Sequence, residues 1–76
     1  MVFKNLMQGE IATVCGFNTG NKQFKRRLMS FGLIPGAEFK IVRIAPLGDP
    51  VQIEVMGSQI ALRKDEADIL QIAKKA

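Results

Sequence analysis

Few side chains of this protein are of the types that carry out chemistry. The sequence contains no His, one Cys and seven Asp or Glu residues. A zinc or iron site of the usual His/Cys type cannot be assembled from one such chain, and the scattered carboxylates show no ligand spacing. Without His, no Ser/His or Cys/His pair of nucleophile and base can form. No glycine loop ends in the Gly-Lys-Ser/Thr of a phosphate site. The sequence therefore predicts no catalytic residues, no metal and no cofactor.

The single cysteine and the densest group of acids have structural interpretations. Cys15 excludes an internal disulfide, which fits a reducing compartment, and we expect it to be a small buried side chain. Asp65, Glu66 and Asp68 lie close together. An exposed turn or the start of a helix explains these three residues, because acidic groups stabilise the N-terminal end of a helix.

Size and hydropathy predict one soluble, cytoplasmic domain over residues 1–76. The 76 residues are 47% hydrophobic, which excludes a disordered chain. A domain of this length buries roughly 60% of its unfolded surface. The segment Met1–Asn5 lacks a basic region followed by an apolar run, so no signal peptide is indicated. No apolar stretch approaches the ~18 residues that cross a bilayer.

The chain has a net charge of +4, and its densest cluster of charges contains Lys22, Lys25, Arg26 and Arg27. A solvated helix face explains this cluster, since positive charge also favours the C-terminal end of a helix. The functional alternative is docking on an acidic protein surface or on lipid headgroups. Nucleic-acid binding is not favoured, because single-strand readers use exposed aromatic rings, whereas every aromatic residue here is Phe, and Phe24, Phe31 and Phe39 fit positions in the core.

Alternating apolar residues predict short strands, and one segment predicts a helix. The helix covers about 22–31, with Phe24, Leu28 and Phe31 on one apolar face. Thr19 or Asn21 would cap its start, and Gly32 would end it. We expect strands within 10–17, 37–45, 51–55, 60–62 and 69–72, a hairpin turn at 56–59, a short helical turn at 64–68 and a frayed tail at 74–76.

Irregular alternation indicates that two of the strands bend. The first strand alternates imperfectly, which allows a bulge, and the second changes phase near Ile41–Arg43. Bulges of this kind close small barrels. The expected fold is therefore mainly β: a small antiparallel barrel of about five strands, similar to an SH3 domain, with one inserted α-helix.

Two turns carry apolar side chains where a loop would normally be polar. The first turn follows the helix and joins Gly32, Pro35 and Gly36 with the apolar pair Leu33-Ile34. The second, 45–50, contains Leu47 beside Gly48, a residue free to adopt positive φ. Either these side chains fold back to cap the barrel, or the two turns lie side by side as one contact patch for another protein.

Three sequence blocks resemble the FeoA family. The segment 27–36 resembles its RLxxxGLxPG core, 45–50 its APLGDP turn, and 60–67 its ALRxxEA segment. The blocks occur in the family's order and spacing, and the resemblance extends over nearly the whole chain. The resemblance implies an SH3-like barrel with an inserted helix and an accessory role in bacterial ferrous iron uptake. The partner it implies is FeoB, a membrane transporter with a cytoplasmic G-protein domain.

From these observations we predict a non-enzymatic adaptor that binds the G-protein domain or membrane part of such a transporter. It would reach the inner membrane only through its partner, bind no nucleic acid, and be free to self-associate. The alternatives are a regulatory SH3-like domain of an iron-dependent repressor system and an RNA-binding small barrel. Gly32, Pro35, Gly36 and Gly48 are predicted to be structural turn residues. The predicted partner contacts are Lys25, Arg26, Leu28, Met29, Leu33, Ile34 and Leu47.

Overall fold

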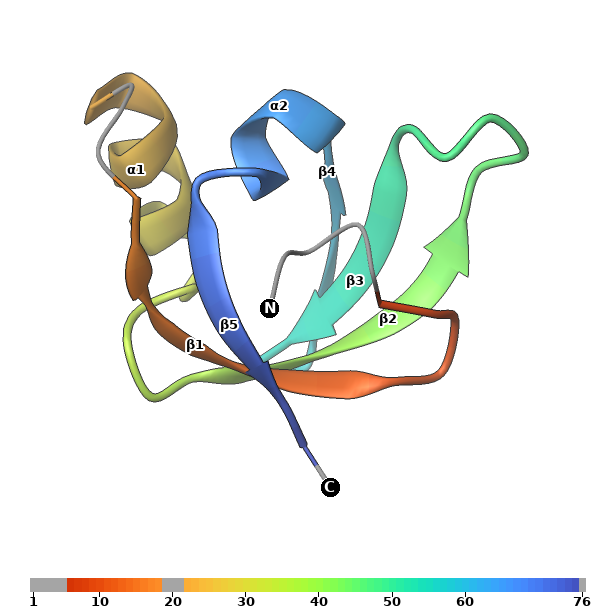
Figure 1. Ribbon diagram of the computed structural model, residues 1–76, viewed down its shortest axis with the longest axis horizontal. Helices are drawn as coiled ribbons and strands as arrows, with labels where there is room; N and C mark the ends of the chain where they lie inside the picture. The colour runs from red at the N-terminus through yellow and green to blue at the C-terminus, as the bar shows by residue number, and fades with distance from the viewer. Residues whose placement is uncertain (1–5, 19–21, 76) are drawn as a thin grey trace.

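In the computed structural model, which describes residues 6–18 and 22–75, five strands form one antiparallel sheet in the order β4-β3-β2-β1-β5. Two helices accompany this sheet (Figure 1). In chain order the elements are β1 (Ile11–Phe17), α1 (Lys22–Ser30), β2 (Glu38–Ile44), β3 (Val51–Val55), β4 (Ser58–Leu62), α2 (Lys64–Ala67) and β5 (Leu70–Lys74).

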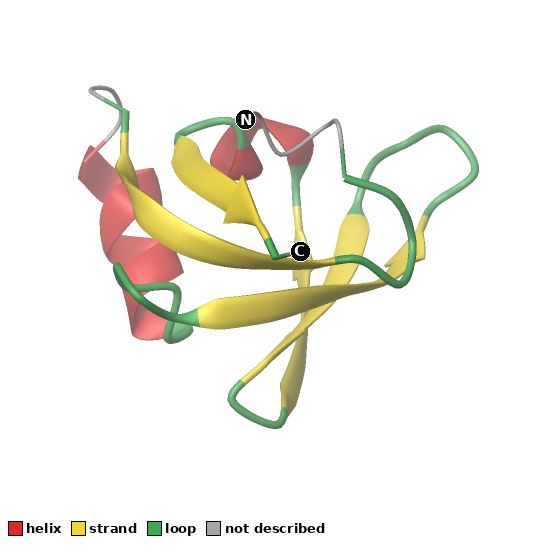
Figure 2. Ribbon diagram, turned by 60° about the horizontal axis from the view of Figure 1, so that its bottom comes forward, coloured by secondary structure: helices red, strands yellow, loops and turns green. Residues whose placement is uncertain are grey.

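The sheet bends at the two expected places. The β1–β5 register shifts between Val14 and Gly16, and the β2–β3 register shifts between Ile41 and Arg43. Each irregularity increases local twist, so the strands curve around a common interior (Figure 2). The mainly β, SH3-like architecture predicted from the sequence is confirmed.

The interior is filled by apolar side chains that the strands present at alternate positions. In β3, Val51, Ile53 and Val55 face inward, while Gln52 and Glu54 face out. The same cluster contains residues from every element: Leu6, Ala12, Val14, Leu28, Leu33, Phe39, Ile41, Val51, Ile53, Val55, Leu62, Ala67, Leu70 and Ile72.

Most expected elements are present, with two corrections. Cys15 is exposed, because it follows buried Val14 and the two-residue alternation of β1 places its side chain on the opposite face. Lys74 lies in β5, and the backbone N–H of Lys75 donates to the carbonyl of Ile11 at 2.9 Å, so these residues continue the sheet and are not a frayed tail. The proposed helix caps Thr19 and Asn21, and Ala76, lie outside the described residues.

The β3–β4 hairpin is closed by a two-residue turn at Met56 and Gly57. Both residues have positive φ, 52° for Met56 and 80° for Gly57. Positive φ at both central positions is the arrangement that matches the twist of the adjoining strands. The turn therefore fixes the pairing of the hairpin, from Val55 opposite Ser58 to Val51 opposite Leu62.

Candidate partner-binding surfaces

The end of α1 is built as a glycine-terminated cap. Gly32 has φ 94°, its N–H donates to the carbonyl of Met29 at 3.0 Å, and the N–H of Leu33 donates to that of Leu28 at 3.1 Å. This pair of bonds is the Schellman motif, in which an apolar contact accompanies the hydrogen bonds. Leu28 and Leu33 supply the apolar side chains at the corresponding positions, and both are 0% exposed.

The burial of Leu28 and Leu33 removes both from the predicted partner contacts. Their side chains face the core. Leu33 therefore folds back to cap the barrel, which was the structural alternative for this turn. Met29 near the end of α1 and Ile34 on the turn are 43% and 45% exposed. The apolar turn after α1 is thus divided: one leucine stabilises the fold and the neighbouring isoleucine faces solvent.

Met56 was missed in the sequence and belongs to this region. A Cβ on Gly32 would lie 2.8 Å from the sulfur of Met56, and Met56 is 80% exposed. The hairpin tip therefore lies over the end of α1. We call Met29, Ile34 and Met56 the knuckle surface. The alternation of β3, which ends just before a turn, gave no indication of this contact.

The second apolar turn presents Leu47 to solvent on a hydrogen-bonded loop. Leu47 is 95% exposed. The N–H of Gly48 donates to the carbonyl of Ala45 at 2.7 Å, and Asp49 Oδ1 accepts from the backbone N–H of Lys64 at 3.0 Å. The last bond ties the loop to the first residue of α2. Leu47 also lies at an apolar pocket of about 180 Å³ whose lining includes Leu6, Ile41, Ile44 and Val51.

The two apolar turns do not form one patch, as the sequence had suggested they would. The turn at 31–37 precedes β2 and the turn at 45–50 follows it, so a strand of roughly 23 Å separates them. Figure 1 shows them at opposite ends of β2, the first at lower left and the second at upper right. The knuckle surface and Leu47 are therefore two separate candidate surfaces.

The predicted basic contacts lie on α1 and are exposed. Lys25 places its Nζ 5.5 Å from the centroid of the Phe17 ring, which orients its side chain by a cation–π interaction. Arg26 is exposed beside it. Both charges remain available for contact with an acidic surface.

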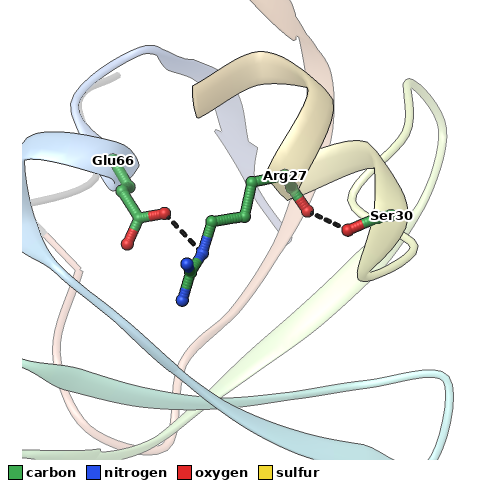
Figure 3. Close-up of polar contacts among 3 residues, drawn as sticks. All are labelled: Arg27, Ser30 and Glu66. Carbon is green, nitrogen blue, oxygen red and sulfur yellow. Dashed lines mark hydrogen bonds and ion pairs between the residues drawn. The ribbon is translucent and has the colours of Figure 1, made fainter. Parts of the chain in front are cut away.

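A buried carboxylate pairs with the next basic residue of α1. Glu66 was expected in an exposed helix start, yet it is 5% exposed and its Oε2 lies 2.8 Å from Nε of Arg27 (Figure 3). The contact is an ion pair that lacks hydrogen-bond geometry, since Oε2 has no hydrogen-bond partner among the described residues. Ser30 Oγ donates to the carbonyl of Arg27 at 2.6 Å. One indication of this pair was present in the sequence: Arg27 and Glu66 each belong to one of the blocks that resemble the FeoA family.

Glu10 and Lys74 form an ion pair between the start of β1 and the end of β5. The hydrogen bond from Lys74, and a second from the backbone N–H of Met7 at 2.6 Å, lower the pKa of Glu10 below its ordinary value. A lowered folded-state pKa contributes stability above the unfolded pKa, and this stability is lost as the pH falls through the folded value.

We therefore expect Glu10→Gln to reduce the dependence of stability on pH between neutral and strongly acidic solution. The measurement is the urea midpoint of both proteins from pH 7 down to pH 3. The wild type should lose more stability than the variant across this range. Glu38→Gln is the control. Glu38 pairs with Lys75 at 3.3 Å, and both side chains are about half exposed, so this substitution should change the pH dependence less than Glu10→Gln does. Parallel curves for Glu10→Gln and the wild type would contradict the assignment.

Two further findings concern the described residues as a whole. None of their helices is both long and apolar enough to cross a membrane. Within 6–18 and 22–75, no group of three or more Cys, Asp or Glu side chains is placed to hold a metal ion.

The fold is a small SH3-like β-barrel that exposes apolar and basic side chains on its surface. The model of the FeoA domain family matches residues 1–74, and the chain belongs to that family. It is 34% identical to the solved FeoA protein of Chlorobium tepidum, covering 100% of this chain and 71% of that one with a TM-score of 0.89. FeoA of Stenotrophomonas maltophilia, solved in complex with zinc and described as a prokaryotic SH3 domain protein, is 28% identical over 96% of this chain and 89% of that one, with a TM-score of 0.82.

One curated relative joins two functions in one chain. It is the Fe(2+) transport protein A/Fe(2+) transporter FeoB fusion protein of Porphyromonas gingivalis. The identity is 30% over 53 residues, which is 70% of this chain and 6% of the relative's length. This protein thus resembles one small part of a much longer transport protein.

Proposed function

We propose that this protein is a non-enzymatic accessory protein of bacterial ferrous iron uptake that binds a FeoB-type transporter at the cytoplasmic face of the inner membrane. The observation that carries the proposal is the fusion of a similar segment to FeoB in one chain. A covalent link raises the effective concentration of two modules for each other. Where the FeoA-like protein and the transporter are separate chains, they would have to come together by binding each other.

Such a protein acts on a transporter through differences in affinity. A bound protein shifts a conformational equilibrium only by as much as it favours one state over the other. The accessory protein would therefore bind one state of the transporter, or of its G-protein domain, more tightly than the others. This mechanism requires a rigid contact surface and no reacting groups.

Leu47 is the contact residue that the geometry supports best. Its loop is held by backbone bonds and by Asp49, so little ordering is needed when a partner binds. A few residues commonly supply most of the energy of an interface. Met29 and Ile34 offer a second apolar contact, and Lys25 and Arg26 would accelerate association with an acidic surface.

We expect Leu47→Ser to leave the melting temperature nearly unchanged and to reduce co-purification with the transporter at least tenfold. The reason is that this side chain is 95% exposed and contributes little to the core. The control is Ile11→Thr, which removes another exposed apolar side chain, 37% exposed on β1, and should leave co-purification intact. Normal recovery of the transporter with Leu47→Ser would place the interface elsewhere.

We also expect the isolated protein to bind no ferrous iron with micromolar affinity and to release no phosphate from GTP. The sequence has no His and one Cys, and Cys15 has no cluster of ligands around it among the described residues. Anaerobic calorimetric titrations with Fe²⁺ and with Zn²⁺ should be flat. A saturable heat at one equivalent per monomer, or GTP turnover proportional to protein after repurification, would contradict the assignment.

A further inference from the structure

The two edge strands of the sheet differ in how they are protected. An edge strand exposes unpaired N–H and C=O groups, and proteins usually protect it with lysines, prolines or bulges. Strand β5 pairs with β1 through a register shift and ends at Lys74, which is followed by Lys75. Strand β4, at the other edge, pairs with β3 in continuous register and contains no charged residue, proline or bulge: its sequence is SQIAL. The β4 edge therefore lacks these protections.

The hairpin geometry identifies the groups that this edge presents. In a two-residue hairpin the residues beside the turn exchange both backbone bonds, and hydrogen-bonded pairs then alternate along the strands. Ser58, Ile60 and Leu62 consequently bond to β3. The N–H and C=O groups of Gln59 and Ala61 point away from β3. Both residues are exposed, and neither makes a backbone bond outside the hairpin within 6–18 and 22–75.

Arginines lie along the same edge. Arg63 follows β4 in an extended conformation, with φ −76° and ψ 147°, so its side chain shares a face with that of Ala61. Ala61 and Pro50 line two neighbouring hollows of about 240 and 330 Å³. Arg43 lines the first, and Arg27 and Arg63 line the second.

Two acids near this edge are already engaged, while Glu54, opposite Gln59 on β3, and Asp65, which lines a hollow with Arg27 and Arg63, are exposed. The arginines have free donors. Asp49 accepts from the backbone of Lys64, and Glu66 is buried against Arg27. In Figure 3 the terminal nitrogens of Arg27 point away from the Glu66 carboxylate, and the Arg27 side chain is 59% exposed. A guanidinium with free terminal nitrogens binds carboxylates through paired hydrogen bonds.

We propose that the β4 edge binds an extended acidic segment of another protein as an added strand. The segment's backbone would pair with Gln59 and Ala61, and its carboxylates would contact Arg63 and Arg27. A second copy of this chain is disfavoured as the occupant, because two such edges would bring their arginines together between proteins of net charge +4. The inference concerns a separate surface from Leu47 and does not depend on the proposed transporter.

The test uses a capped seven-residue peptide that alternates valine with glutamate, titrated into the ¹⁵N-labelled protein. The expected addition is antiparallel to β4. In that arrangement directly opposite residues share a face and exchange both backbone bonds, so glutamates on the face of Arg63 pair with β4 through their own amides. We expect amide shifts and slowed hydrogen exchange centred on Gln59 and Ala61. Methylating the glutamate amides should weaken binding at least tenfold, whereas methylating the valine amides should leave it unchanged.

Two protein variants complete the test. Arg63→Gln should weaken peptide binding about fivefold or more, and Lys40→Gln, which removes the same charge from exposed Lys40 on β2, should not. Ala61→Pro should abolish binding, because proline lacks the outward N–H that the peptide would use. The hairpin itself should remain, since β3 does not use that N–H. Should that variant fail to fold, the two methylated peptides still decide. Equal effects of the two methylations, or shifts centred on α1, would overturn the proposal. So would a wild-type dimer that Ala61→Pro converts to monomer, since the occupant would then be a second copy.

Discussion

Replacing Gly32 with valine is expected to lower the melting temperature by roughly 5–20 °C. The φ of 94° at Gly32 is a conformation that side chains with a Cβ rarely adopt, and forcing it costs about 1–3 kcal/mol. In a domain of this size each kcal/mol corresponds to about 4–8 °C. The new Cβ would also lie 2.8 Å from the sulfur of Met56, which must move. Thermal unfolding followed by circular dichroism measures the effect.

Matched alanine variants separate the two causes. Gly48→Ala places a Cβ at a φ of 84° with nothing within 4 Å, so it reports the backbone cost alone. Gly32→Ala adds the contact with Met56 and should be more destabilising than Gly48→Ala. In a Met56→Ala background the difference between the two should shrink. If this difference is the same in the wild-type and the Met56→Ala backgrounds, the contact with Met56 does not contribute to it.

Replacing Leu33 with alanine is expected to destabilise the protein by about 2–5 kcal/mol, the usual cost of a buried leucine side chain. Leu33 is 0% exposed and packs in the core. Its neighbour Ile34 is 45% exposed, so Ile34→Ala should change stability by no more than about 1 kcal/mol. Urea unfolding of the two variants compares adjacent residues of one turn. Similar losses for both would mean that Ile34 also packs inside.

Family resemblance and surface geometry contribute different parts of the functional picture. The family match assigns the chain to FeoA, and the fusion relative supports a transporter as partner. Neither identifies the residues in contact. The loop that carries Leu47 and the unprotected β4 edge are features of the three-dimensional structure, and each can be tested without the other.

The sequence by itself determined the local structure of this protein. Gly32 ends α1, the phase change near Ile41–Arg43 marks the β2 bulge, and the alternation of β3 predicts its inner face. These features follow from interactions between residues close in the chain: backbone conformation, helical spacing and the two-residue period of a strand. The same local signals, combined with size, were sufficient to predict a small bent barrel.

Tertiary structure alone decided which residues of the two apolar turns face solvent, and that Glu66 is buried. Leu33 and Leu47 both lie in apolar turns, yet one is 0% and the other 95% exposed. Their exposures differ because the chain beyond Gly32 folds back over the core, while the 45–50 loop extends past the end of β2. Likewise Arg27 meets Glu66 only because α1 and α2 are brought together across the barrel. Burial depends on contacts between segments distant in sequence, and no local pattern encodes them.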